Sequence, residues 1–199
     1  MDNLRHRCLP VILMLLVLNA RAAEGPAKPA AQAPSWEAVG WGGGGFFWAA
    51  AFHPTRGNII YLGGDVNGFY KSENSGKRWR ICNNGIADYA VYSLAVDAKN
   101  PDTVYAGTVG GVCKSVDAGE HWEFLKQTGS KALAITSTRD KSVRGLAVDP
   151  SSGIVYAGTP GGKVFKSEDG GQTWTKLYEL PSKGAVSSII VSARNPKLL

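Results

Sequence analysis

Short apolar runs separated by polar or glycine-rich turns occupy most of the chain. Three runs, at 59–64, 104–108 and 155–159, each place a tyrosine two residues before a glycine. A second apolar run precedes each of them and ends at His53, Asp97 or Asp149. Two shorter runs follow, separated by a polar turn. The order of strands and turns predicts four short antiparallel strands in every unit.

A gapless motif, Lys-Ser-x-Asn/Asp-x-Gly-x-x-Trp, recurs at 71–79, 114–122 and 166–174. The serine hydroxyl and the acid can accept backbone N–H groups in a hairpin turn, and the glycine allows a positive φ there. The tryptophan can pack between neighbouring sheets. Its fixed residues, expected to be structural, are Ser72, Asn74, Gly76 and Trp79, then Ser115, Asp117, Gly119 and Trp122, then Ser167, Asp169, Gly171 and Trp174.

This motif resembles the Asp-box (BNR) repeat of sialidases, sortilin-type receptors, photosystem assembly factors and family 74 glycoside hydrolases. Four short strands in a period of about 40 to 50 residues are typical of a propeller blade. The predicted fold is therefore all-β, an incomplete β-propeller of four-stranded Asp-box blades. It contains about three blades and part of a fourth.

The last residues repeat an earlier part of the chain. Residues 188–199 match 93–104, so a fourth blade would be cut inside its second strand. Propellers usually have four to eight blades. We expect residues 35–199 to be the N-terminal part of a propeller whose remaining blades come from a longer chain. Closure by association of separate chains is the alternative. Residues 35–39 are expected to supply an outer strand of the last blade.

The N-terminus has the pattern of an export signal. Arg5 and Arg7 precede the apolar run 10–18, which is too short to span a bilayer, and Ala20-Arg-Ala22 is typical of a cleavage site. We expect a signal peptide at 1–22, a linker at 23–34, a secreted or periplasmic protein, and no membrane association after cleavage. An uncleaved anchor is the alternative.

Two cysteines remain after the signal, Cys82 and Cys113. Export would permit a disulfide, but Cys113 stands where the other units have Tyr70 and Phe165. A buried packing thiol is therefore the favoured interpretation, and pairing stays open.

The composition limits the classes of partner. The formal net charge is +6, without a run of Lys or Arg, so nucleic acid is not an expected partner. The histidines and cysteines lack metal-ligand spacing, and neither a phosphate loop nor a nucleophile elbow is present. The sequence predicts no metal site and no cofactor.

Asp65 is an acid that the repeat does not need. It lies four residues after Tyr61, where the other units have Val109 and Pro160. The turn between second and third strands faces away from the Asp-box turns, because alternate turns of an antiparallel sheet lie at opposite ends. Asp65 either caps its own glycine turn or serves a function.

Residues 36–80 resemble the opening of the family 74 glycoside hydrolases, the xyloglucanases. The shared features are a glycine run, a strand ending in His53-Pro54, and the segment 60–70 that contains Asp65. The resemblance implies that Asp65 is catalytic and that the full-length protein is an inverting endo-β-1,4-glucanase or xyloglucanase of two facing propellers. Gly64 and Asn67 depart from the family pattern. Inversion requires two carboxyl groups, so this chain alone should be inactive.

Trp48, Tyr89 and Tyr92 are expected near Asp65, where they could stack on the sugar rings of a β-glucan. Packing between blades is their alternative role. A non-catalytic propeller for protein binding or assembly, like sortilin or photosystem assembly factors, is the alternative function. A sialidase would need an arginine triad, for which Arg139 and Arg144 are the nearby candidates.

Overall fold

The computed structural model describes residues 45–86, 88–125, 142–181 and 184–192. The predicted signal peptide at 1–22, the linker at 23–34, the outer strand at 35–39 and Arg139 lie outside these residues. None of the described residues belongs to a helix long and apolar enough to cross a bilayer.

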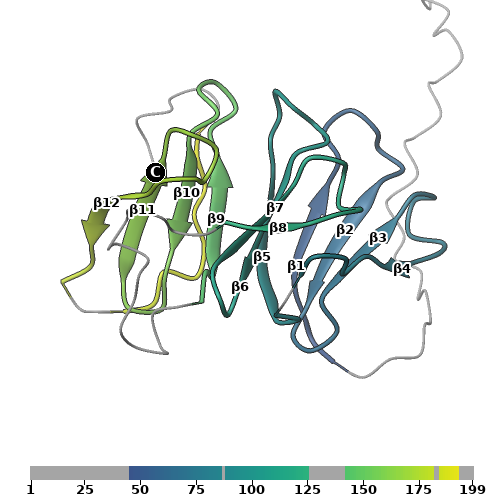
Figure 1. The fold of residues 1–199 in the computed structure, drawn as a ribbon, viewed down its shortest axis with the longest axis horizontal. Coiled ribbons are helices and arrows are strands. Elements are labelled where there is room, and N and C mark those ends of the chain that lie inside the picture. The colour runs from purple at the N-terminus through teal and green to yellow at the C-terminus, as the bar shows by residue number, and fades with distance from the viewer. Residues whose placement is uncertain (1–44, 87, 126–141, 182–183, 193–199) are drawn as a thin grey trace, which may run out of the picture. The chain divides into compact units, whose positions relative to one another are not determined.

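The described residues form three antiparallel four-stranded sheets (Figure 1), here called the first, second and third blades. The strands pair in chain order, each with the next one along the chain. The strands are β1 Phe47–Phe52, β2 Ile60–Gly64, β3 Phe69–Ser72 and β4 Arg80–Ile81; β5 Val91–Val96, β6 Val104–Thr108, β7 Val112–Ser115 and β8 Glu123–Phe124; β9 Gly145–Val148, β10 Val155–Gly158, β11 Lys163–Ser167 and β12 Thr175–Glu179. The predicted order of four strands per repeat is confirmed.

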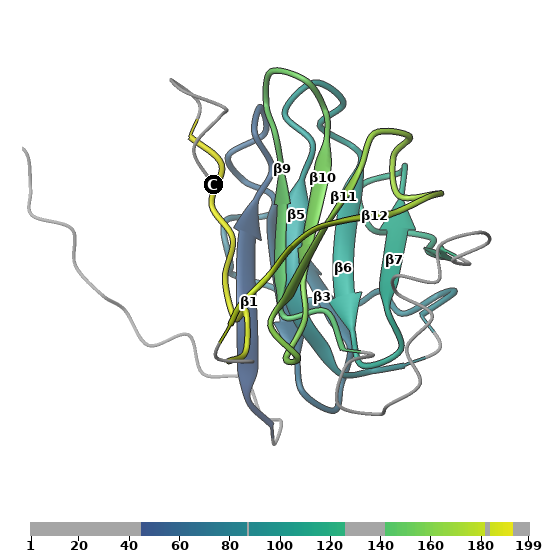
Figure 2. The same ribbon diagram turned by 90° about the vertical axis from the view of Figure 1, so that its left-hand side faces the viewer.

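The blades meet along their first strands. β5 packs against β1 and β2 on one side and against β9 on the other. Figure 1 shows this succession of sheets, and Figure 2 views the same sheets one behind another with the third blade in front. Glycines in the second strands permit the close approach. A Cβ on Gly158 would stand 2.9 Å from Val186 Cβ, and Gly63 faces Val91 in the same way. Sheets repeated side by side through their inner strands are the architecture of a propeller.

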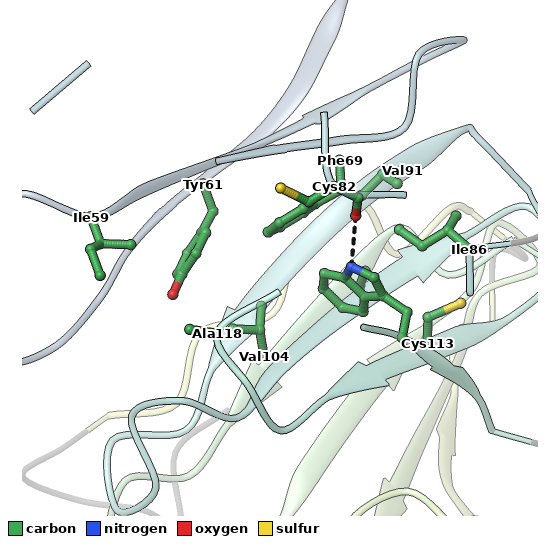
Figure 3. Close-up of a cluster of buried hydrophobic side chains, with 11 residues drawn as sticks. Ile59, Tyr61, Phe69, Cys82, Ile86, Val91, Val104, Cys113 and Ala118 are labelled. Atoms are coloured by element: carbon green, nitrogen blue, oxygen red, sulfur yellow. Dashed lines mark hydrogen bonds between the residues drawn. The ribbon is translucent and has the colours of Figure 1, made fainter. Parts of the chain in front are cut away.

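Buried side chains fill the space between consecutive blades. Between the first and second blades, Tyr61, Phe69 and Val104 are almost fully buried with Trp122 (Figure 3). The Trp122 ring meets Phe69 edge-on at 4.7 Å, and its indole N–H donates to the Cys82 carbonyl oxygen at 3.0 Å, the dashed bond in Figure 3. Trp174 occupies the same place between the second and third blades, with Tyr105 and Val112. Each of these two motif tryptophans therefore joins its blade to the preceding one.

The motif serines organise the turns between the third and fourth strands. Ser115 Oγ donates to Asp117 at 2.8 Å and accepts the Gly119 N–H at 2.8 Å, and Asp117 accepts the His121 N–H at 2.9 Å. Ser167 makes the matching bonds in the third blade. In the first blade Asn74 replaces the acid and still accepts from Ser72 and from the Arg78 N–H.

The segment 184–192 lies where a fourth blade would place its first strand. The Val186 N–H donates to the Thr159 carbonyl oxygen at 2.9 Å, as the Val143 N–H donates to Thr108 at 2.9 Å one blade earlier. The segment is not a strand in the structure, because none of the described residues forms a ladder with it. The part of a fourth blade is thus present as an extended segment against β10.

Cys82 and Cys113 are buried free thiols. Burial, with a smaller effect of the Asp88 charge, raises the pKa of Cys113 to about 12. The Cys113 thiol is therefore protonated and packs as a small apolar side chain, as the repeat position suggested.

Candidate functional site

Asp65 lies in the turn between β2 and β3, at the end of the first blade opposite the turn that holds Ser72 and Asn74. Its carboxylate Oδ1 accepts the Phe46 N–H at 2.9 Å. Its own N–H donates to the Phe46 carbonyl oxygen at 2.9 Å. The turn is thereby attached to the residue that precedes β1, and the acid caps a neighbouring segment instead of its own glycine turn.

Glycine at position 45 makes this attachment possible. Gly45 has φ 132°, and a Cβ there would stand 2.9 Å from Asp65 Oδ1. Any other residue would bring both strain and a contact with the carboxylate. Gly45, the last residue of the glycine run, is therefore required by the local structure around Asp65.

An aromatic row begins beside Asp65 and crosses the inner strands of the blades. The Phe46 and Trp48 rings lie 5.4 Å apart, and Trp48 meets Tyr92 edge-on at 5.8 Å. The guanidinium of Arg144 lies over the Tyr92 ring, 4.7 Å from its centre. Trp48 is 50% exposed, so its ring is available to solvent. We call Phe46, Trp48, Tyr92 and Arg144 the inner-strand row.

Tyr89 lies on the other side of the same turn. The Gly68 N–H donates to the Tyr89 carbonyl oxygen at 2.8 Å, and the Tyr89 side chain is exposed. Asn83 also holds this turn: it accepts the Phe69 N–H at 2.8 Å and donates to the Asn67 carbonyl oxygen at 2.9 Å. The structure thus brings Tyr89 to the turn of Asp65, and Phe46 links Asp65 to Trp48 and Tyr92.

Two members of the row were not predicted as site residues. Phe46 is highly exposed and binds Asp65 through its backbone, which no sequence pattern indicates. Arg144 was considered only for an arginine triad. Its signal is the repeat: Trp48, Tyr92 and Arg144 each stand five residues before His53, Asp97 or Asp149, the residues that directly follow β1, β5 and β9.

The charged groups at this end are few. Asp88, in the loop before β5, accepts the Ala90 N–H at 3.2 Å, as a loop cap does. The described residues contain no cluster of His, Cys, Asp and Glu suited to a metal ion. One carboxylate beside exposed aromatic rings can bind a polar ligand with apolar faces and can act as an acid or base.

Xyloglucanases are similar to this chain in sequence. It is 32% identical over 179 residues to a xyloglucanase of Hypocrea jecorina, covering 80% of this chain and 21% of the relative. It is 30% identical over 194 residues to a xyloglucanase of Acetivibrio thermocellus, covering 84% and 22%. The chain spans about a fifth of the length of these relatives. No family model matches it.

Solved structures of family 74 glycoside hydrolases share the fold. An ancestral enzyme of that family has a TM-score of 0.62 at 22% identity, over 80% of this chain and 22% of that one. The xyloglucanase of Xanthomonas campestris has a TM-score of 0.58 at 24% identity, over 80% and 27%. The chain is an incomplete β-propeller that resembles the family 74 glycoside hydrolases over most of its length.

Proposed function

We propose that this chain supplies a catalytic carboxylate and part of the glycan-binding face of an exported β-1,4-glucan hydrolase that acts on xyloglucan. The observation that carries the proposal is the position of Asp65, held by the backbone N–H of Phe46, whose ring contacts the exposed Trp48 ring. Sequence similarity to xyloglucanases over most of the chain supports the choice of substrate.

The proposed chemistry is inversion. Asp65 acts as the general base that takes a proton from a water, and the water attacks the anomeric carbon. A general acid on the other face of the sugar protonates the leaving oxygen. The two carboxyl groups would be about 6.5 to 9.5 Å apart. Asp65 supplies one of them, and we assign the general acid to a residue outside the part of the chain that the structure describes.

The proposed binding follows from the aromatic side chains. Sugar rings present apolar C–H faces, and exposed aromatic rings bind such faces. Trp48, Tyr92 and Tyr89 would carry a glucan chain past Asp65. The chain alone should bind the glucan without cleaving it.

The catalytic test compares two substitutions of Asp65, each made in the full-length polypeptide by expression of the altered gene. Asp65→Asn keeps an oxygen that accepts the Phe46 N–H and removes the base, and we expect xyloglucan hydrolysis to fall about 10²-fold or more. Asp65→Ala removes both. Full activity of Asp65→Asn together with loss in Asp65→Ala would assign Asp65 a structural role and would favour a non-catalytic propeller.

The binding test uses two aromatic residues of the same strand. Trp48→Ala should weaken binding of a xyloglucan oligosaccharide, measured by calorimetry. Phe52→Ala is the matched control, because Phe52 is 65% exposed at the opposite end of β1. Equal loss in both variants, or in neither, would contradict the assignment of the face.

A further inference from the structure

Three members of the inner-strand row, one from each blade, occupy the same structural position. Trp48 comes from the first blade, Tyr92 from the second and Arg144 from the third. Adjacent members touch, Trp48 against Tyr92 and Tyr92 beneath Arg144. The matching residue of the segment 184–192 is Ser187, which is exposed and small. The row therefore changes from aromatic rings in the first two blades to a cation in the third.

Arg144 lacks an ionic partner within the part of the chain that the structure describes. Its Nε is buried and makes no hydrogen bond there. Two other arginines are paired, since Arg56 binds Asp102 and Arg80 binds Glu120. Arg144 is half-buried against Tyr92, so part of its charge has left water without a carboxylate in exchange.

A buried N–H without a partner destabilises a protein by about 1–3 kcal/mol, so its presence calls for an explanation. A guanidinium stacked on a ring keeps its N–H groups directed outward in the guanidinium plane. That arrangement matches a carboxylate, which guanidinium binds with two parallel hydrogen bonds. The buried Nε is out of a ligand's reach, so a carboxylate would pair with the terminal nitrogens of Arg144 and supply the opposite charge that the described residues do not.

We propose that Arg144 forms a subsite for a carboxylate-bearing sugar, a uronic acid unit in a β-1,4-linked glycan whose neighbouring rings stack on Tyr92 and Trp48. The inference rests on the proposed function, because the aromatic part of the row is the glycan-binding face described there. It adds a preference for acidic over neutral chains, and it assigns that preference to the third blade.

The test measures two oligosaccharides of equal length and linkage by calorimetry at low salt. One is cellohexaose, which is neutral, and the other is the hexasaccharide of β-1,4-linked glucuronic acid. The native protein should bind the acidic ligand about tenfold more tightly, as one charge-assisted pair can provide. About 0.15 M salt should reduce this preference, since the terminal groups of the pair reach solvent.

Three arginine variants locate the effect. Arg144→Gln should abolish the preference and leave the affinity for cellohexaose within about twofold, and Arg144→Lys should retain part of it because lysine keeps the charge without the fork. Arg78→Gln is the control, since Arg78 is an exposed arginine in the turn at the opposite end of the first blade. Near-ultraviolet circular dichroism checks that each variant retains its aromatic packing.

The outcomes separate this inference from the proposed function. Equal affinity of the native protein for both ligands, or a preference that survives in Arg144→Gln, would overturn the acidic subsite and leave the glycan-binding face standing. Failure to bind either hexasaccharide would overturn the acidic subsite, and the xyloglucan oligosaccharide would then decide separately on the glycan-binding face. Equal loss of both ligands in a folded Arg144→Gln protein would reduce Arg144 to a support for the Tyr92 ring.

Discussion

Gly63 of the first blade faces Val91 of the second so closely that a Cβ on Gly63 would stand 2.7 Å from Val91 Cγ1 and 2.8 Å from the Val91 carbonyl oxygen. Gly107 and Gly158 face Val143 and Val186 in the same way. The repeated tyrosine-x-glycine pattern of the sequence thus marks the surfaces where inner strands of consecutive blades meet.

Gly63→Ala should destabilise the protein by about 2–3 kcal/mol, because the added methyl group meets backbone as well as side-chain atoms and the blades must separate. Gly57→Ala is the matched control. No atom lies within 4 Å of a Cβ there, so this change should stabilise slightly, by about 0.5 kcal/mol, through the unfolded chain. Urea unfolding of both variants measures the difference. A Gly63→Ala protein as stable as Gly57→Ala would contradict the close packing of the blades.

Asn74→Asp should stabilise the first blade at neutral pH. In the other turns burial opposes ionisation, yet the hydrogen bonds to the acids prevail and lower the pKa of Asp117 and Asp169 to about 2, from an ordinary value of 3.8. A carboxylate at 74 would accept the Ser72 and Arg78 bonds with a charge, which strengthens them. The site is exposed to solvent, so we expect a gain of only about 0.5 kcal/mol.

The pH dependence of this gain follows from the direction of the shift. A carboxyl group whose pKa is lower in the folded protein stabilises it above the unfolded pKa, and the effect is lost as pH falls through the folded value. The advantage of Asn74→Asp should therefore disappear between about pH 4 and pH 2. Unfolding measured at pH 7 and pH 2 checks this, with Asn74→Ala as the variant that loses the acceptor at both. A gain that is unchanged at pH 2 would contradict the charged turn.

The strand order and the blade repeat were predictable from the sequence, because alternation, glycine turns and the motif tryptophans are local signals. The end of the blade on which Asp65 lies was predictable too, since it follows from counting antiparallel strands. The bond from Phe46 N–H to Asp65 was not, because it depends on the positive φ of Gly45 and on the chain returning beside its own turn.

The inner-strand row was also predictable only in part. Aligning the repeats places Trp48, Tyr92 and Arg144 at one position, which the sequence contains. Trp48 and Tyr92 stand at irregularities in the pairing of β1 with β2 and of β5 with β6, which change the local direction of these side chains. Such irregularities leave no periodic signal in the sequence.

Glu120→Gln should destabilise the protein by about 1 kcal/mol because it removes the charge that faces Lys71 across the blade interface. Lys71 is 3% exposed, and its Nζ lies 2.6 Å from Glu120 Oε1. The Arg80 hydrogen bond, opposed by burial and aided by Lys71, lowers the pKa of Glu120 to about 2. Glu73 stays 3.3 Å from Lys71 and Gln can still accept hydrogen bonds, so the loss is smaller than for an isolated buried pair.

Glu168→Gln is the matched comparison, because it removes the charge from a second lysine–glutamate pair with the same separation. Lys166 Nζ is also 2.6 Å from its glutamate, but the Lys166 side chain is 34% exposed and the pair lies within one turn of the third blade. Water replaces that partner readily, so the variant should unfold at the same urea concentration as the native protein. If both substitutions had the same effect, burial of Lys71 at the interface would not be the cause. A double-mutant cycle with Lys71→Met then measures the coupling across the blades directly.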